Sequence, residues 1–505
     1  MQKLLIRTSI LTLALLVGFA SVASVAADRP PAGSKTAKVH PDALRGPNAI
    51  PTGVTDPGYG LFSCQVGLSV GQCYDPFQMR HAYNVDNLIS KGFDGTGKTI
   101  VIIDAFSHPN IESQLAYFNS FYGLPQMNAG PGTPTFTQVA PDGFGPYDPG
   151  WAEEISLDVE WAHAIAPGAN IVLELGADNS DVALLSAFND AVNNNRGDVI
   201  SMSFGESDTC LGPDLTAAWH QAFVKATKKG ITIFASTGDE GAAQPSCDGS
   251  SWIKSTSSPA SDPLVTGVGG TELHAADYCL VSLGCDPASN PAPGTYQSEI
   301  AWNEGPPYGD FQPYFDSTIA SGGGFSTVWD KPYYQQGTFR GKMRGEGDVS
   351  YNAAVLHGVL TYLNMPGVPV GFYRFGGTSA GSPQWAALTA IADQTVGHNY
   401  GFINAALYNM GLIQALGFLK PFHDVTSGTN SALEYDASNN PVDITGYSAG
   451  PGWDAVTGLG TPKASDVIAE LPWLWSPAQG KAAIAQSQPH SEGKSWNGRH
   501  EHRPH

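Results

Sequence analysis

The chain is short of basic residues. It has 25 lysines and arginines against 46 aspartates and glutamates in 505 residues, which gives a formal net charge of −21. Proteins that bind nucleic acid need an excess of lysine and arginine to neutralise phosphates. The composition therefore argues against a nucleic-acid partner. It suits a protein kept soluble in acid, where protonation removes carboxylate charge.

Long apolar runs are missing beyond the N-terminus. Residues 1–27 have a basic start at Lys3 and Arg7, then an apolar run, and small residues at the end. This pattern is typical of a secretory signal peptide, cleaved here after Ala26 or Ala27. No later stretch approaches the roughly 20 apolar residues that span a bilayer. We therefore expect an exported protein, extracellular or periplasmic, with no membrane attachment once the signal is removed.

Cysteine is scarce, with six residues in the whole chain. An even number in an exported protein indicates disulfides, the alternative being free buried thiols. The spacing suggests the pairs Cys64–Cys73, Cys210–Cys247 and Cys279–Cys285. The middle pair is the one that spacing supports least.

No internal repeat is visible, which favours one large domain. Residues 28–73, rich in proline, glycine and polar residues, are expected to form a short leader or loosely docked arm. From residue 74, expected strands (98–104, 170–175, 198–203 and 231–235) alternate with expected helices (111–122, 153–165, 181–194 and 215–229). This order predicts an α/β fold with a mostly parallel central sheet flanked by helices.

Three further segments complete the predicted organisation. Residues 275–314 look like an insertion of loops. The catalytic domain is expected to span 74–475. The tail over 476–505 is dominated by glutamine, serine, histidine and glycine, and it is expected to be disordered.

A serine lies where a helix is expected to begin. The string GTSAGSP at 377–383 precedes an apolar helix, and Pro383 fits only the first turn. Free backbone N–H groups and the helix dipole would stabilise an oxyanion formed at Ser379. The same pattern also fits an ordinary helix N-cap. As a nucleophile, Ser379 could belong to the G-x-S-x-G elbow of α/β-hydrolases, with His398 or His423 as the base.

Two bases compete for Ser379. The order Asp104, His163, Ser379 would give a subtilase triad, but the H-G-T-H type motif is absent and His163 lies in an apolar helix. Glu154 and Asp158 are four residues apart, so they share one face of a helix. Two neighbouring carboxyls keep one proton in mild acid, and such a pair could accept and return the serine proton. An acidic, solvent-exposed helix face is the alternative explanation.

The helix string EISLDVEWAHAIAPGA from Glu154 resembles the Glu/Asp helix of the sedolisin family, the serine-carboxyl peptidases. The serine string is likewise similar to that of subtilases and sedolisins. The resemblance runs from about residue 74 to 462 and includes six more motifs, at 74–84, 201–205, 259–263, 268–271, 321–326 and 348–350. It implies a subtilisin-like fold and an endopeptidase that cuts peptide or protein substrates at acidic pH. We expect it to be a monomer.

The resemblance also implies a role for individual residues. Ser379 would be the nucleophile, Glu154 the general base and acid, and Asp158 the residue that holds and tunes Glu154. Asp239, in the string STGDEG, would be a protonated carboxylic acid that donates to the oxyanion, and one such donor lowers a barrier by about 3 kcal/mol. Asp104 would join the proton network. Ser203, Phe204 and Gly205, in a loop that would shape the pocket, are expected to bind substrate.

A calcium site is implied by two glycine-rich segments about 25 residues apart, HDVTSG from 423 and AGPGWD from 449. Carboxylates with backbone carbonyls form the hard-oxygen cage that Ca²⁺ prefers. The family likeness assigns one structural ion to Asp424, Val425, Gly450, Gly452 and Asp454. Two other functions stay open at this stage: a subtilase-type peptidase that uses His163, and a non-catalytic binding protein on the same fold.

Overall fold

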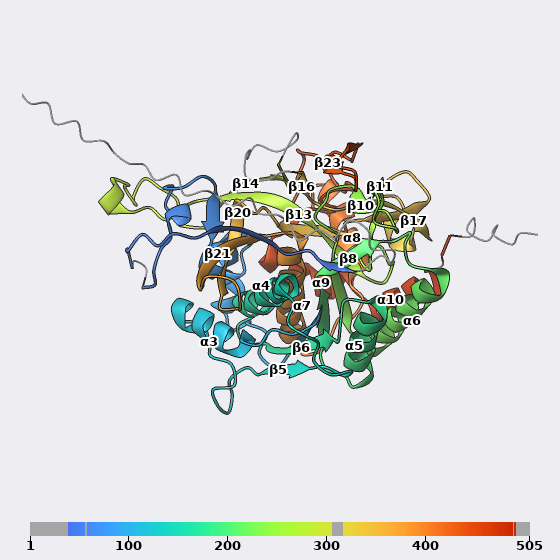
Figure 1. The fold of residues 1–505 in the computed structure, drawn as a ribbon, viewed down its shortest axis with the longest axis horizontal. Helices are drawn as coiled ribbons and strands as arrows, with labels where there is room; N and C mark the ends of the chain where they lie inside the picture. The colour runs from blue at the N-terminus through green and yellow to red at the C-terminus, as the bar shows by residue number, and fades with distance from the viewer. Residues whose placement is uncertain (1–38, 56–57, 306–316, 488, 491–505) are drawn as a thin grey trace, which may run out of the picture.

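The computed structural model describes residues 39–55, 58–305, 317–487 and 489–490 (Figure 1). The predicted signal peptide, the start of the predicted leader and the end of the predicted tail lie outside these ranges. An eight-stranded sheet has the order β14-β13-β9-β7-β4-β6-β5, with β19 beside β13. Its strands are β4 (Thr99–Ala105), β5 (Phe136–Val139), β6 (Asn170–Gly176), β7 (Val199–Met202), β9 (Thr232–Ser236), β13 (Thr266–Ala275), β14 (Tyr296–Ala301) and β19 (Val349–Asn352).

All neighbouring strands in this sheet are parallel except β13 and β14. The strands β4, β7 and β9 are almost continuously buried apolar runs, as parallel strands covered on both faces should be. Helices flank the sheet on two sides (Figure 1). They include α3 (Ile111–Tyr122), α4 (Pro149–Ile165), α5 (Asp181–Asn193), α6 (Pro213–Lys229), α7 (Gly381–Val396), α8 (Asn404–Ala415) and α9 (Ala464–Leu474). The predicted α/β architecture is confirmed.

The helix that carries the carboxyl pair begins earlier than the sequence indicated. The expected start was residue 153, whereas α4 begins at Pro149. The Asp148 side chain accepts a hydrogen bond from Trp151 N, and proline occupies the first turn. An aspartate N-cap and a proline in the first turn are both common at the start of α-helices. The extra turn leaves Glu154 in the regular, buried part of the helix.

The N-terminal arm is not loosely docked, so that prediction is wrong for its described part. Strand β1 (His40–Pro41) pairs antiparallel with β8 (Phe204–Ser207), and β2 (Leu44–Asn48) pairs antiparallel with β21 (Gly371–Gly376). Strand β3 (Gln72–Tyr74) pairs parallel with β20 (His357–Leu363). In Figure 1 the blue arm crosses the molecule between β21 and β8. Its backbone groups are therefore used in sheet pairing.

Two other loop or tail predictions also need correction. Residues 296–301, expected to be loop, form β14 and extend the main sheet. Residues 477–486, expected to be disordered, form α10 (Pro477–Gln486). Gly480 and Ala483 are buried on this helix, and Tyr333 donates a hydrogen bond to the Gln479 carbonyl. The polar composition of the tail gave no indication that one small face of α10 is buried.

All six cysteines are paired as the spacing suggested: Cys64–Cys73, Cys210–Cys247 and Cys279–Cys285. The three predicted disulfides are confirmed. Among the described residues, no helix combines the length and the apolar composition needed to cross a membrane.

Candidate active site

Ser379 lies in a tight turn between β21 and α7. The turn needs glycine at position 377, whose φ is +95° and where a β-carbon would lie 2.0 Å from the carbonyl oxygen of Asp42. Ser379 is completely buried in a 3-10 turn that leads directly into α7. It therefore lies where free backbone N–H groups and the positive end of the helix dipole favour negative charge.

The hydroxyl of Ser379 bonds to a carboxyl group. Its Oγ donates to Oε2 of Glu154 at 2.9 Å, and the Ser203 carbonyl oxygen lies at 3.4 Å. Helices α4 and α7 pack against each other, which brings these two side chains together. Over the described part of the chain, no imidazole forms a hydrogen bond with Ser379.

His163 is on the same helix as Glu154, but its ring contacts a backbone carbonyl and not Ser379. Its Nε2 lies 2.8 Å from the Pro125 carbonyl oxygen, and the ring is fully buried. Burial lowers the pKa of His163 to about 4. The ring therefore has a structural role in packing α4, and the Asp-His-Ser alternative has no geometric support.

Glu154 and Asp158 are both fully buried, which excludes the solvent-exposed acidic face. Oε2 of Glu154 accepts from Ser379 and from the Ala43 amide, while Oδ1 of Asp158 accepts from the Ser203 hydroxyl at 2.9 Å. The other oxygen of each carboxyl, Oε1 and Oδ2, accepts no hydrogen bond from another residue in the described part of the chain, and the two carboxyl groups hydrogen-bond to each other. A single proton between these two oxygens would satisfy both.

The electrostatics of the pair favour that shared proton. Burial, and then the negative charges of Asp158, Asp104 and Asp42, raise the pKa of Glu154 well above its ordinary value. Burial raises the pKa of Asp158 to about 8. Asp104, at the end of β4, is also fully buried with both oxygens unpartnered in the described structure, and burial and Asp158 raise its pKa. These three carboxyls are therefore protonated in part well above pH 4.

Asp239 approaches the serine turn from the other side. Its Oδ1 accepts from the Thr378 backbone N at 2.7 Å and from the Thr378 hydroxyl at 2.9 Å. Its Oδ2 has no partner among the described residues. Burial, then the charges of Asp42 and Glu240, raise the pKa of Asp239 well above its ordinary value. A protonated Oδ2 is a hydrogen-bond donor aimed at this turn.

The arm places a peptide bond between these carboxyls. A β-carbon at Gly377 would lie 2.0 Å from the Asp42 carbonyl oxygen and 2.5 Å from Oδ2 of Asp239, so those two oxygens are close neighbours. On the other side, the Ala43 amide donates to Oε2 of Glu154 at 2.7 Å. The carbonyl of the Asp42–Ala43 bond thus faces Asp239, and its nitrogen faces Glu154.

The residues expected to bind substrate are paired with the arm. His40 is opposite Gly205 and Pro41 opposite Phe204, and Asp42 N donates to the Ser203 carbonyl at 3.3 Å. The Asp42 side chain accepts from the Ser236 hydroxyl at 2.6 Å. The sequence did not indicate the involvement of residues 40–43, because a two-residue strand has no periodicity to detect.

The two segments expected to hold calcium lie together. Gly452 N lies 3.1 Å from each carboxylate oxygen of Asp424, and Gly450 N lies 3.1 Å from Oδ2 of Asp454. Val425, next to Asp424, is buried. Both oxygens of Asp454 also accept from Val456 N, Thr457 N or the Thr457 hydroxyl. Carboxylates and backbone carbonyls are the oxygen ligands that Ca²⁺ prefers, so the residue types in these neighbouring segments are compatible with a Ca²⁺ ion.

Comparison with known proteins finds relatives over most of this chain. The subtilase family model matches residues 156–399. The chain is similar to kumamolisin from Bacillus sp. (strain MN-32), with 30% identity over 419 residues, 80% of this chain and 64% of the relative. It is also similar to sedolisin from Pseudomonas sp. (strain 101), with 32% identity over 362 residues, 69% of this chain and 53% of the relative. The chain thus spans less than two thirds of the length of each.

The solved structure of Pseudomonas sedolisin, described as a serine-carboxyl proteinase complexed with two molecules of pseudo-iodotyrostatin, is also similar. It matches with a TM-score of 0.64 and 27% identity, over 80% of this chain and 99% of that chain. The shared architecture therefore covers nearly the whole of that solved chain.

Proposed function

Because the chain belongs to the sedolisin family, with its subtilisin-like fold, we propose that it is a serine-carboxyl endopeptidase that cleaves peptide or protein substrates in acid. The observation that carries this proposal is the 2.9 Å hydrogen bond from Ser379 Oγ to Glu154 Oε2. It joins a nucleophile to a base in a buried site. The base is a carboxyl group.

The proposed first step is attack of Ser379 Oγ on a substrate carbonyl. Glu154 takes the hydroxyl proton at Oε2, and its link to Asp158 spreads the resulting charge and proton over the pair. The carbonyl oxygen becomes an oxyanion beside Asp239 and the N-terminus of α7. One well-placed donor of this kind lowers the barrier by about 3 kcal/mol.

In the proposed second step, Glu154 returns the proton to the leaving amine. The 2.7 Å contact of the Ala43 amide with Glu154 Oε2 supports this, because it has a peptide nitrogen within reach of the acid. Water then repeats the sequence on the acyl-enzyme. Asp239 must be protonated throughout to donate, so the mechanism works in acid and fails when that proton is lost.

We further propose that the described arrangement is a latent form. The arm lies antiparallel to β8 and presents the Asp42–Ala43 bond to the reactive groups, as an extended substrate would. An external substrate could not use this strand while residues 40–43 are there. The first bond cut by the protein would then be its own.

The calcium ion is proposed as a structural component held by Asp424, Val425, Gly450, Gly452 and Asp454. When bound, it would cross-link the two loops and take no part in proton transfer. The protein is proposed to act outside the cytoplasm, in keeping with the signal-like residues 1–27 and the three disulfides.

The proposal is tested by digesting a denatured protein substrate at acidic pH with the purified chain. We expect cleavage by the wild-type protein and none by Ser379→Ala. Ser382→Ala is the control, since this buried serine at the start of α7 bonds to the Ser201 hydroxyl and not to Glu154. If the wild-type chain, with its arm removed, cleaves nothing between about pH 2 and pH 8, the protein is a binding protein on a peptidase fold. If Ser379→Ala cleaves normally, the nucleophile is wrong.

A further inference from the structure

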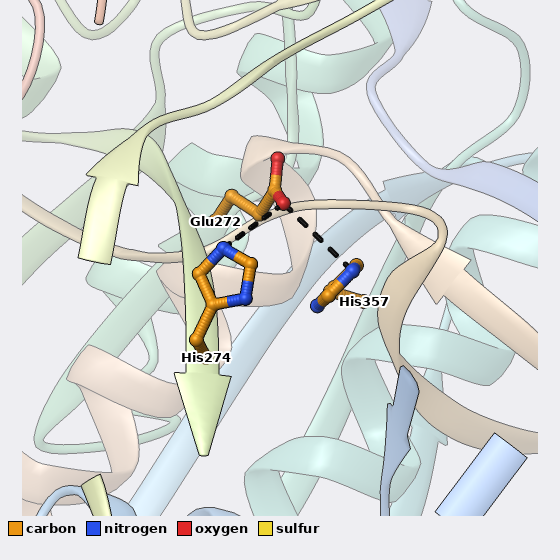
Figure 2. A group of neighbouring side chains, drawn as sticks. All are labelled: Glu272, His274 and His357. Carbon is orange, nitrogen blue, oxygen red and sulfur yellow. Dashed lines mark ion pairs between the residues drawn. The ribbon is translucent and has the colours of Figure 1, made fainter. Parts of the chain in front are cut away.

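A second cluster of ligand-type side chains lies on β13 and β20, outside the proposed catalytic groups. Glu272 and His274 are two residues apart on β13, so they point to the same face of the sheet. His357 is the first residue of β20. Figure 2 shows the Glu272 carboxylate between the two imidazoles. One ligand atom from each residue lies within 4.8 Å of the other two.

The distances within the cluster suit a small divalent cation. Nε2 of His274 lies 3.2 Å from Oε1 of Glu272, and Nε2 of His357 lies 3.8 Å from the same oxygen. Ligands about 2.1 Å from a tetrahedral Zn²⁺ ion are about 3.4 Å from one another. These two separations lie on either side of that value, and the three ligand atoms all lie within 4.8 Å of one another, so the cluster is of a size to hold a Zn²⁺ ion once the side chains adjust.

An ordinary ion pair does not explain both rings. One imidazole is enough to pair with one carboxylate, yet here both Nε2 atoms face the same oxygen. The rings are 4.7 Å apart between centroids and inclined at 68°, so neither is stacked on the other. Two nitrogens and one oxygen converge, which is the donor set of a His₂Glu metal site.

The two strands that carry the ligands are held in fixed register. The buried side chain of Asn352 accepts from Leu273 N at 3.0 Å and donates to the His357 carbonyl at 2.8 Å. It therefore joins β13, between its two ligands, to the start of β20. Metal sites depend on such supporting contacts, because they fix the ligands before the ion arrives.

Access and local charge also suit a cation. Glu272 and His357 are each only 6% exposed, whereas His274 is about one third exposed and faces solvent. Two other carboxyls, Glu299 and Glu304, lie close enough to interact electrostatically with the cluster. Arg374 adds one positive charge, although its guanidinium is bound to the Val70 and Leu356 carbonyls.

We propose that Glu272, His274 and His357 bind one Zn²⁺ ion, with the fourth position open to water on the side of His274. Imidazole nitrogen with a single carboxylate favours zinc over the hard, oxygen-seeking Ca²⁺. The ion would cross-link β13 and β20 and so stabilise the sheet beside β14. This site is separate from the proposed calcium loops and from the proposed peptidase chemistry.

The test is Zn²⁺ titration of the full-length Ser379→Ala chain by calorimetry at about pH 7.5, above the ordinary pKa of imidazole. The buffer contains excess Ca²⁺ to fill any oxygen site. We expect one Zn²⁺ per chain and, with Co²⁺ in its place, the visible absorption of a tetrahedral nitrogen-ligated ion. His274→Ala should weaken Zn²⁺ binding by more than about 100-fold, because even outer-shell partners cost about 10–100-fold.

His81→Ala is the matched control, since His81 forms an exposed pair with Asp86 at 2.7 Å and lies outside the ligand cluster found among the described residues. It should leave Zn²⁺ affinity unchanged. Glu272→Gln, which keeps the side-chain shape, gives a second variant, and circular dichroism checks that each variant is folded. No Zn²⁺ binding by the parent chain, or undiminished binding by folded His274→Ala and Glu272→Gln, would overturn the proposal.

Discussion

The backbone amide of Ala43 donates a 2.7 Å hydrogen bond to Oε2 of Glu154, the same oxygen that accepts the hydroxyl of Ser379. A peptide nitrogen from the protein's own arm thus lies within hydrogen-bond distance of the proposed base. Asp42, on the other side of this bond, has its carbonyl oxygen close to Asp239.

The first prediction concerns the Asp42–Ala43 peptide bond. When the wild-type chain is moved to acid, we expect mass spectrometry to find a new N-terminus at Ala43, because that bond faces both proposed catalytic carboxyls. The Ser379→Ala chain should remain intact under the same conditions. Maturation of the wild-type chain only at other bonds would show that the arm is held in a non-reactive position.

Asp239 should stabilise the proposed oxyanion only while its carboxyl group is protonated. Burial and the neighbouring Asp42 and Glu240 raise its pKa, so the proposed donor is present in acid and is lost as pH rises through that pKa. Asp239→Ala should reduce kcat by about 100–1,000-fold, the usual cost of losing an oxyanion donor. Asp239→Asn retains an N–H donor at every pH, so its remaining activity should persist further toward neutral pH. An unchanged pH profile in Asp239→Asn would contradict this role.

The folded state should lose stability as pH rises from about 6.5 to 8. Burial raises the pKa of Asp158 and Asp393 to about 8 and that of Glu304 to about 7. These pKa values exceed those of the same groups in the unfolded chain, about 4, so the native state binds more protons than the unfolded state. The stability that these protons contribute is therefore lost as pH rises through the pKa values of the folded state. Buried neutral histidines such as His163 act in the opposite direction, but only below about pH 6.5.

The measurement is the free energy of urea unfolding of the Ser379→Ala chain across that range, where self-digestion cannot interfere. A decrease with increasing pH is expected. Constant or increasing stability would mean that these carboxyls are ionised in the native state, which would also weaken the proposed proton sharing.

Removal of calcium should destabilise the protein without altering the proton chemistry. A ligand present at 100 times its Kd stabilises the native state by about 2.7 kcal/mol, so a chelator should lower Tm measurably. Asp424→Asn should lower Tm in the presence of Ca²⁺ and abolish the effect of the chelator. Asp436→Asn is the control, since that carboxylate lies in an exposed turn whose hydrogen bonds are local. A chelator effect that survives Asp424→Asn would place the ion elsewhere.

The sequence was informative wherever function depends on local spacing. Glu154 and Asp158 share a helix face because they are four residues apart, and Ser379 precedes a helix that Pro383 helps to begin. The alternating strands and helices were enough to predict the parallel sheet. The prediction that Ser379 meets Glu154 rested on family resemblance, since helix periodicity says nothing about which two helices pack together.

Features that depend on long-range pairing could not be predicted. The arm pairs through the two-residue β1 and through β2, whose partner β21 lies more than three hundred residues further along the chain. The cluster of Glu272, His274 and His357 was not predicted, because its third member comes from a different strand. Helix α10 was missed because only Gly480 and Ala483 of its residues are buried.

The most direct test of the account is the pH dependence of kcat/KM for the wild-type chain, His163→Ala and Glu154→Gln, with Glu153→Gln as a neighbouring carboxyl control. We predict activity in acid that fades toward neutrality, retained in His163→Ala and Glu153→Gln and reduced by about 100–10,000-fold in Glu154→Gln. Activity that rises toward neutral pH and is abolished in His163→Ala would show that an imidazole, and not Glu154, takes the serine proton.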